Sequence, residues 1–183
     1  LSISDRVAVM SDGQLEQVGE PETVFQHPES RFVAGFLGYA SFLPGFVTGD
    51  AVETELGSVS REQIHGLAPE YDRTRIDVLV RPDDLHATPG GRLDGDASTN
   101  GTVVGRRYLG PTILYEVELD DGTRLQCMHN HDAGIPMDAR VRLTLSATHE
   151  LSWFPADQRP ADGEARGLNG DVVGHPDALG DDE

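Results

Sequence analysis

Three side chains of metal-binding type alternate along one short stretch of this sequence. Cys127, His129 and His131 stand at positions i, i+2 and i+4, and alternate residues of a β-strand point to the same face. Thiolate and imidazole groups together form a ligand set that suits Zn²⁺ or copper. The spacing therefore predicts a candidate metal site, provided that the strand continues as far as His131.

The same stretch also fits a strand that ends in a polar loop. Asn130, Asp132 and Gly134 favour a turn, and Cys127 would then be a small core side chain. Structural zinc sites usually have four protein ligands, and the sequence offers no evident fourth. We favour the strand end and keep the metal site as the alternative.

Two further pairs of charged residues have a chemical and a structural interpretation. Asp83 and Asp84 could be paired carboxylates for acid–base chemistry, but capping of a Pro-Asp-Asp turn explains them more simply. Arg106 and Arg107 could contact an anion or a partner subunit, although solvated or ion-paired arginines are the simpler interpretation. No Gly-x-Ser-x-Gly elbow is present, so we assign no catalytic residue.

The charge composition is strongly acidic. The chain has 183 residues, 32 acidic and 14 basic, with a net charge of −18, and every basic residue is arginine. This lysine-free composition resembles that of cytoplasmic proteins of extreme halophiles, whose self-repulsion is screened by high salt. No basic stripe is available for a phosphate backbone, which argues against nucleic acid as a partner. The single cysteine excludes an internal disulfide and fits a reducing cytosol.

The first 40 residues predict a hairpin and two short helices. Strands over residues 6–10 and 14–18 flank Ser11-Asp12-Gly13, and Asp-Gly is a strong hairpin-turn signal. Pro21 suits the first turn of a helix that runs to residue 26. Ser30 is a good N-cap for a second helix, which Gly38 closes.

From residue 41 the pattern changes to short apolar–polar alternations with Gly, Asp and Pro between them, which predicts a small all-β domain. Residues 88–99 show no apolar period and predict a flexible excursion. The acidic, Gly- and Pro-rich tail over residues 156–183 predicts disorder. About seven strands are expected, over residues 42–48, 51–55, 76–81, 101–109, 113–119, 123–128 and 140–146, with residues 151–154 as a closing piece.

The residues of the N-terminal part resemble a known family. The run DRVAVMSDGQLEQVGEPETVFQHPESRFVAGFLG, Asp5 to Gly38, is similar to the stretch just after the switch-histidine segment in the ATP-binding subunits of ABC importers for maltose, polyamines and ferric iron. That family carries a Gln-x-Gly-x-Pro element followed by a Pro and a Phe-Val-Ala-x-Phe-x-Gly helix. Farther along, the Arg81-Pro82-Asp83-Asp84 motif resembles part of the accessory transport-associated OB (TOBE) domain.

The resemblance implies a mainly β fold in three parts. Residues 1–40 would be the last hairpin and helices of an α/β ABC ATPase domain, and residues 41–155 an OB-like TOBE barrel with a regulatory role. Residues 156–183 would be the disordered acidic tail. A P-loop requires Gly-x-x-x-x-Gly-Lys-Ser/Thr, and this chain has no lysine. The chain is therefore expected to start downstream of the catalytic residues, to bind no cofactor and to have no ATPase activity alone, while the intact subunit would bind ATP and Mg²⁺.

The resemblance also implies partners and a location. The expected partners are a second copy of the subunit, in a homodimer, and the membrane permease subunits of an importer. The protein would be cytoplasmic and peripheral on the inner face of the membrane. In agreement with this location, the sequence contains no run of 18 apolar residues that could span a bilayer. Phe42-Leu43-Pro44-Gly45 favours ferric iron or polyamine over sugar as the solute. The alternative from another class is a stand-alone OB-like module that binds a small ligand or a metal.

Overall fold

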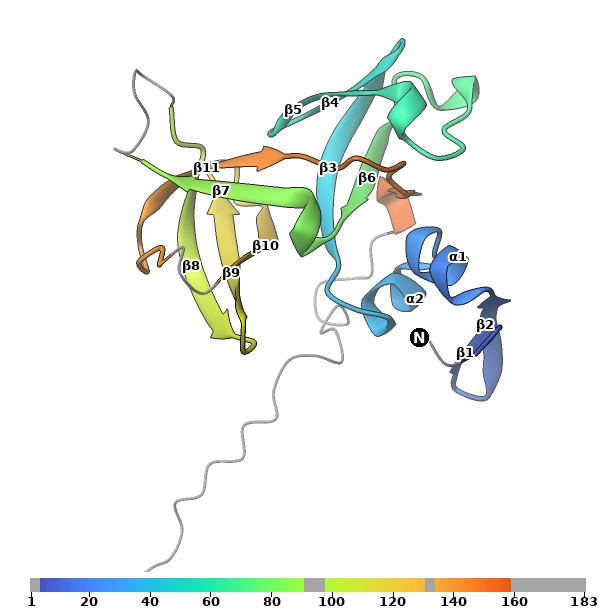
Figure 1. Cartoon of the computed structure of the whole chain (residues 1–183). Coiled ribbons are helices and arrows are strands. Elements are labelled where there is room, and N and C mark those ends of the chain that lie inside the picture. Colours follow the sequence, from blue (N-terminus) through green and yellow to red (C-terminus); the bar gives the residue numbers. More distant parts are fainter. Residues whose placement is uncertain (1–3, 91–97, 131–133, 159–183) are drawn as a thin grey trace, which may run out of the picture.

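The fold is mainly β, as predicted (Figure 1). A computed structural model describes residues 4–90, 98–130 and 134–158. We call residues 4–40 the N-terminal segment and residues 41–155 the β-domain; that these are separate domains remains a prediction. Within the described ranges, no helix is long and apolar enough to cross a membrane. The tail predicted to be disordered falls almost wholly on residues 159–183, outside the described residues; Ala156–Gln158 forms a 3₁₀ turn, η5.

The N-terminal segment opens with the predicted hairpin. Strands β1 (Val7–Ser11) and β2 (Gln14–Gly19) pair antiparallel, with Ser11 opposite Gln14. The two loop residues both have positive φ, 49° at Asp12 and 79° at Gly13. This is the backbone twist that a two-residue hairpin loop needs, and Asp-Gly adopts it readily.

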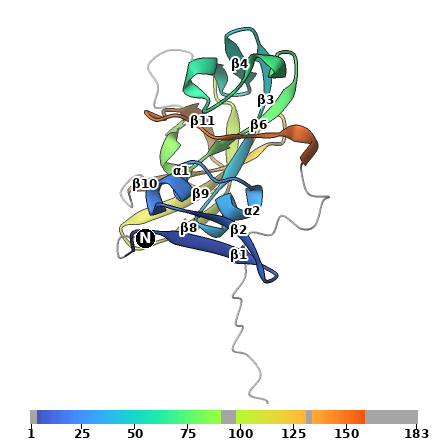
Figure 2. The ribbon, with the colours of Figure 1, turned by 90° about the vertical axis from the view of Figure 1, so that its right-hand side faces the viewer.

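Two short helices follow the hairpin, α1 (Pro21–Gln26) and α2 (Arg31–Phe36). The hydroxyl of Ser30 accepts a hydrogen bond from the Val33 N–H at 3.2 Å, which confirms Ser30 as the N-cap of α2. Val9, Val24 and Val33 form a small buried cluster between the hairpin and the helices. In Figures 1 and 2 the helices lie between the hairpin and the β-domain.

The β-domain contains two five-stranded antiparallel sheets. The order in the first sheet is β12-β6-β3-β4-β5, and in the second β10-β9-β8-β11-β7. The first contains β3 (Ser41–Thr48), β4 (Ala51–Thr54), β5 (Gly57–Ser60), β6 (Arg75–Val80) and β12 (Trp153–Pro155). The second contains β7 (Leu85–Pro89), β8 (Gly101–Tyr108), β9 (Thr112–Leu119), β10 (Arg124–Asn130) and β11 (Arg140–Leu145). Three 3₁₀ turns connect strands: η1 (Arg61–Gln63), η2 (Pro69–Tyr71) and η3 (Pro82–Asp84).

One hydrophobic core joins the two sheets. Leu43 and Val78 from the first sheet belong to the same buried cluster as Tyr115 and Leu143 from the second. Tyr115 is fully buried, and its hydroxyl accepts a hydrogen bond from the Ile135 N–H at 3.1 Å. Burial of this aromatic side chain therefore leaves its polar end satisfied.

Two strands were missing from the sequence prediction. β5 carries a single apolar side chain, Val59, in a Gly-Ser-Val-Ser stretch, so it has almost no apolar pattern. β7 overlaps the region predicted to be a flexible excursion from Thr88, yet Thr88 pairs with Arg142 and Pro89 with Val141 of β11. The pairing to β11 extends the sheet through Thr88 and Pro89. Residues 91–97, which make up most of the expected excursion, lie outside the described part of the chain.

Candidate functional site

Two of the three predicted metal ligands lie on β10. Cys127 is fully buried and belongs to the main core, and burial raises the pKa of its thiol to about 12. Metals bind the thiolate, not the thiol. A thiol with so high a pKa is a poor ligand at neutral pH, so the core interpretation of Cys127 agrees with its surroundings.

The neighbouring histidine is engaged in a hydrogen bond. His129 Nε2 accepts from the Ala87 N–H of β7 at 3.1 Å, and the His86 ring lies beside it with centroids 4.7 Å apart. Burial, and then the charge of His86, lower the pKa of His129. His131 lies outside the described residues, and within the described ranges no group of three His, Cys, Asp or Glu residues could hold a metal ion. The three-ligand site therefore remains a prediction.

The most elaborate cluster of polar contacts lies where the N-terminal segment meets the β-domain, and we call it the junction. At its centre is Arg81, which is 6% exposed. Its guanidinium donates to the carbonyls of Ala34 (2.9 Å) and Tyr39 (3.0 Å) and to that of Phe25 (3.1 Å). It also lies 4.2 Å from the centroid of the Phe25 ring. One cation therefore satisfies carbonyls in the last turns of both α1 and α2, where helix dipoles favour positive charge.

A second arginine crosses the junction in the opposite direction. Arg31, the first residue of α2, donates to Asp77 Oδ2 at 2.8 Å and to the Pro155 carbonyl at 3.0 Å. Its guanidinium carbon lies 4.6 Å from the ring centroid of Phe42 and 5.3 Å from that of Phe154. Asp77 is fully buried, so this pair is shielded from solvent far more than a surface ion pair.

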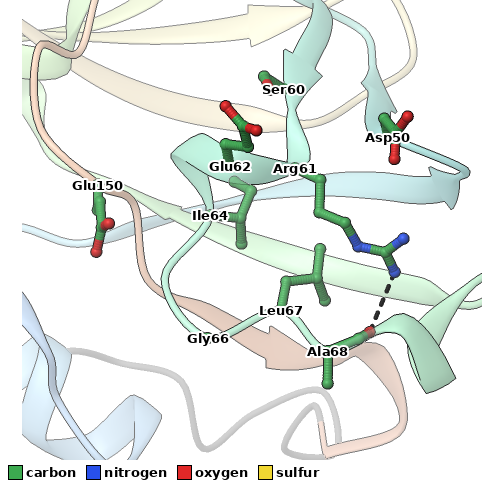
Figure 3. Close-up of a pocket in the computed structure, with 9 residues that line it drawn as sticks. All are labelled: Asp50, Ser60, Arg61, Glu62, Ile64, Gly66, Leu67, Ala68 and Glu150. Atoms are coloured by element: carbon green, nitrogen blue, oxygen red, sulfur yellow. Dashed lines mark hydrogen bonds between the residues drawn. The ribbon is translucent and has the colours of Figure 1, made fainter.

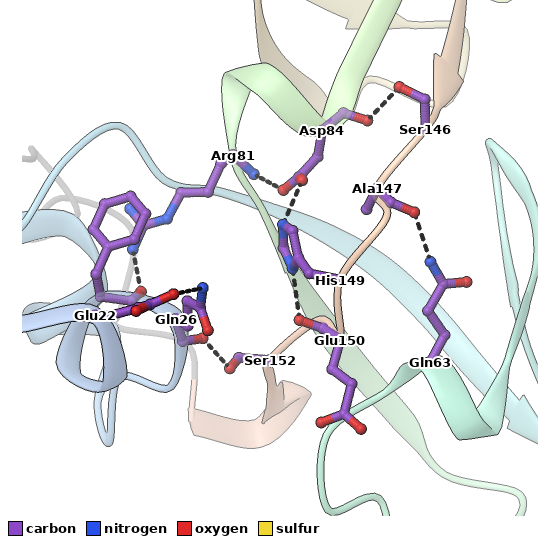
Figure 4. Close-up of polar contacts among 11 residues, drawn as sticks. Glu22, Gln26, Gln63, Arg81, Asp84, Ser146, Ala147, His149, Glu150 and Ser152 are labelled. Carbon is purple, nitrogen blue, oxygen red and sulfur yellow. Dashed lines mark hydrogen bonds and ion pairs between the residues drawn. The ribbon is translucent and has the colours of Figure 1, made fainter.

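The Asp83-Asp84 motif closes the turn that presents Arg81. Asp84 Oδ2 accepts from the backbone N–H of Arg81 at 2.7 Å, and its Oδ1 lies 2.8 Å from His149 Nε2 (Figure 4). The Asp84 carbonyl accepts from the Ser146 N–H at 2.7 Å. These contacts fit the capping interpretation of the motif, because both carboxylate oxygens of Asp84 have a structural partner.

The hydrogen bond that His149 Nδ1 donates to the backbone carbonyl of Glu150, at 2.7 Å, raises the pKa of His149. The charge of Asp84 adds to the rise, while burial opposes it. The segment 149–152 reaches α1 as well, because the Ser152 hydroxyl donates to the Gln26 carbonyl at 2.7 Å. Segment 149–152 thus contacts the η3 turn on one side and α1 on the other (Figure 4).

The Gln-x-Gly-x-Pro element holds the turn between the two helices. Gln17 donates from Nε2 to the His27 carbonyl and accepts at Oε1 from the Glu29 N–H, both at 3.0 Å. A Cβ at Gly19 would lie 3.1 Å from a methyl carbon of Val24. The glycine therefore allows the close approach of β2 to α1.

Arg106, Trp153 and Phe154 all contact other parts of the β-domain or of the core. Arg106 lies over the Tyr108 ring, 5.4 Å from its centroid. Trp153 donates from Nε1 to the His65 carbonyl at 3.0 Å, and Phe154 is 5% exposed. Trp153 therefore packs against the main core, and Phe154 belongs to a smaller buried cluster with Ala34 and Leu79.

A hollow of about 690 Å³ lies beside η1 (Figure 3). Arg61 lines it, but its Nη1 and Nη2 donate to the carbonyls of Gly49 and Ala68. Its walls comprise Asp50, Ser60, Arg61, Glu62, Ile64, Gly66, Leu67, Ala68 and Glu150. The lining has three carboxylates and one arginine, and the arginine already donates to main-chain carbonyls. The hollow therefore favours a cationic ligand over an anionic one.

Arg81 and Asp84 stand out in the sequence as part of a motif, but the motif does not indicate what their side chains contact. Arg31 was missed altogether, since an arginine at the start of a short helix has no distinctive pattern. The signal that could have found it is Asp77, the single acidic residue of strand β6, which stands between apolar Ile76 and Val78 and needs a partner when buried. Together the contacts of the junction can hold the N-terminal segment and the β-domain in a fixed relation.

Residues 78–152 match the sequence profile of the TOBE domain. The chain is 38% identical over 133 residues to the spermidine/putrescine import ATP-binding protein PotA of Pseudomonas fluorescens, an alignment that covers 68% of this chain and 34% of that protein. It is 30% identical over 145 residues to the putrescine transport ATP-binding protein PotG of Escherichia coli, which covers 74% of this chain and 38% of that protein.

The match thus spans little more than a third of the length of these relatives. Among solved structures, the cytoplasmic molybdate-binding protein ModG aligns with a TM-score of 0.44 and 17% identity, over 61% of this chain and 93% of that one.

Proposed function

From the premise that residues 78–152 form a TOBE domain, we propose that this chain is the C-terminal part of the ATP-binding subunit of an ABC importer. The alignments with the import ATP-binding proteins carry the proposal. They extend over 133 and 145 residues and are therefore much longer than the TOBE match. The similarity includes sequence outside that domain, so it is not a likeness of the TOBE domain alone.

The exposed apolar surface of the N-terminal segment supports a larger protein. Leu15 is 59% exposed, Met10 58% and Phe36 50%, all on the hairpin or α2. A group of exposed apolar side chains is typical of a surface that packs against another part of a protein. In this proposal the hairpin and helices complete an ATPase domain whose remaining sequence lies upstream.

In the intact subunit, ATP and Mg²⁺ would bind to the upstream part. The present chain has no lysine for a P-loop, and we assign it no catalytic or nucleotide-binding residue. The subunit would form a homodimer and act on the permease subunits at the cytoplasmic face of the membrane. The β-domain would then be regulatory, connected rigidly to the ATPase domain by Arg31 and Arg81.

The proposed solute is a polyamine. The named relatives import spermidine and putrescine, and the sequence favoured polyamine or ferric iron; nothing in the comparisons favours ferric iron. Uptake of radiolabelled spermidine, maltose and ferric iron should be compared in cells with and without the full gene. Loss of spermidine uptake alone is the expected result, and unchanged uptake of spermidine would overturn the polyamine assignment.

A further inference from the structure

A stacked pair of histidines joins α1 to the β-domain. The ring centroids of His27 and His65 lie 3.9 Å apart, with an angle of 26° between the planes. His27 is the C-cap residue of α1. His65 belongs to the loop after η1, where its N–H donates to the Leu151 carbonyl at 2.9 Å. The pair therefore crosses the junction.

Each ring has a polar partner on segment 149–152. His65 Nδ1 lies 2.8 Å from Glu150 Oε2, and His27 Nδ1 lies 3.5 Å from Ser152 Oγ. The Ser152 hydroxyl already donates its proton to the Gln26 carbonyl at 2.7 Å. It can therefore only accept from His27, which assigns a proton to Nδ1 of that ring.

The titratable groups around His27 act in both directions. Burial lowers the pKa of His27, and the positive charges of His65 and, less strongly, His149 lower it further, while Glu150 raises it. The folded junction therefore favours a neutral His27, because burial first, and then the proximity of His65, oppose a charge on this ring.

On the other side of segment 149–152, the pKa of His149 is shifted in the opposite direction. Here the hydrogen bond that His149 donates to the Glu150 carbonyl, followed by the charge of Asp84, raises the pKa of His149 despite its partial burial. Protonation strengthens the contact between His149 Nε2 and Asp84 Oδ1, which are 2.8 Å apart. Acid thus favours the contact of this segment with η3.

We propose that the junction is a proton-operated switch in which segment 149–152 releases α1 and keeps its contact with the η3 turn as the pH falls. At neutral pH, His27 stacks on His65 and the segment is bonded to α1 through Ser152. In acid, repulsion between the two rings releases α1, while charged His149 holds the segment on Asp84. The switch is a property of contacts within this chain and does not depend on the proposed transport function.

The direction follows from proton linkage. Because the folded-state pKa of His27 is lowered from 6.5, the opened state binds a proton more readily than the closed one. Closure is therefore fully favoured above pH 6.5 and is weakened as the pH falls below that value. His149 has the opposite dependence, since its raised pKa makes its contact strongest in acid and weaker as the pH rises.

Hydrogen–deuterium exchange of the whole chain, corrected for the chemical exchange rate at each pH, tests the switch. Peptides covering α1 should lose protection between pH 7.5 and 5.0, because the opened state binds a proton at His27 more readily than the closed one. Peptides from β3 should keep theirs. NMR titration of the His27 ring should give the same midpoint as the loss of protection.

Two variants separate the switch from general acid instability. His27→Gln keeps an amide near Ser152 but cannot be protonated, so its α1 protection should be the same at both pH values. His149→Gln should keep the α1 response and lose only the extra acid protection of residues 146–150. An unchanged α1 in the wild-type chain, or an equal acid response in His27→Gln, would overturn the proposal.

Discussion

The guanidinium of Arg31 lies 2.8 Å from the carboxylate of Asp77, which is fully buried. The two residues are 46 positions apart in the sequence. Arg31 starts helix α2 and Asp77 is in the middle of strand β6. The contact therefore ties the N-terminal segment to the central part of the first sheet. Removal of either side chain leaves a charge in a site that the surrounding Phe42 and Phe154 rings shield from water.

We expect Asp77→Asn to destabilise the chain strongly. A buried charge left without its partner costs about 3 kcal/mol or more, measured here as the free energy of unfolding in denaturant at molar salt. Asp120→Asn is the matched control, since Asp120 pairs with Arg140 at 2.6 Å on an exposed surface, and its effect should be much smaller. Equal effects of the two substitutions would mean that the Arg31–Asp77 pair has no special role.

Arg81→Met should also destabilise the chain, by about 3 kcal/mol, because it leaves three main-chain carbonyls without a donor. Its helices should lose protection from hydrogen exchange before the sheets do. Arg142→Met provides the control, since Arg142 is exposed on β11 and its replacement should alter stability by less than about 0.5 kcal/mol. Similar unfolding curves for both variants would contradict the role given to Arg81.

Cys127 should be unreactive in the folded chain. Burial and a thiol pKa of about 12 leave almost no thiolate at pH 8, so a chromogenic disulfide reagent should label it only after denaturation. The same reasoning predicts no thiolate-to-cobalt absorption band when Co²⁺ is added at pH 7.5. Such a band, lost in Cys127→Ser, would instead support the metal site predicted with His129 and His131.

His149→Gln should affect stability only in acid and near neutrality. Because the pKa of His149 is raised in the folded chain, its contribution is fully present below the unfolded value of 6.5 and is lost as the pH rises through the folded value. Thermal unfolding at pH 5.5 should show a lower midpoint for the variant, and at pH 9 the two curves should coincide. A difference that grows with pH would contradict the pairing with Asp84.

Local patterns in the sequence predicted the local structure well. Asp12-Gly13 specified the hairpin, and Pro21 and Ser30 marked the helix starts. These features depend on backbone preferences of one or two residues. They can be read without knowledge of what packs around them.

Long-range contacts could not be predicted in this way. β7 is a strand because it pairs with β11, more than 50 residues later, and its own residues include Thr88 and Pro89, which signal a loop. The pairing of Arg31 with Asp77 is a second example, because the sequence around each residue does not indicate its partner. The metal prediction from Cys127 rested on strand alternation, which gives the face of a side chain but not its burial.

Calorimetric titration of Mg-ATP in molar salt tests the proposed assignment most directly. This chain should be compared with a version extended upstream along its gene through the proposed ATPase domain. The account predicts binding by the extended protein and none by residues 1–183. Tight binding of Mg-ATP by this chain alone would contradict it and would favour a self-contained ligand-binding module.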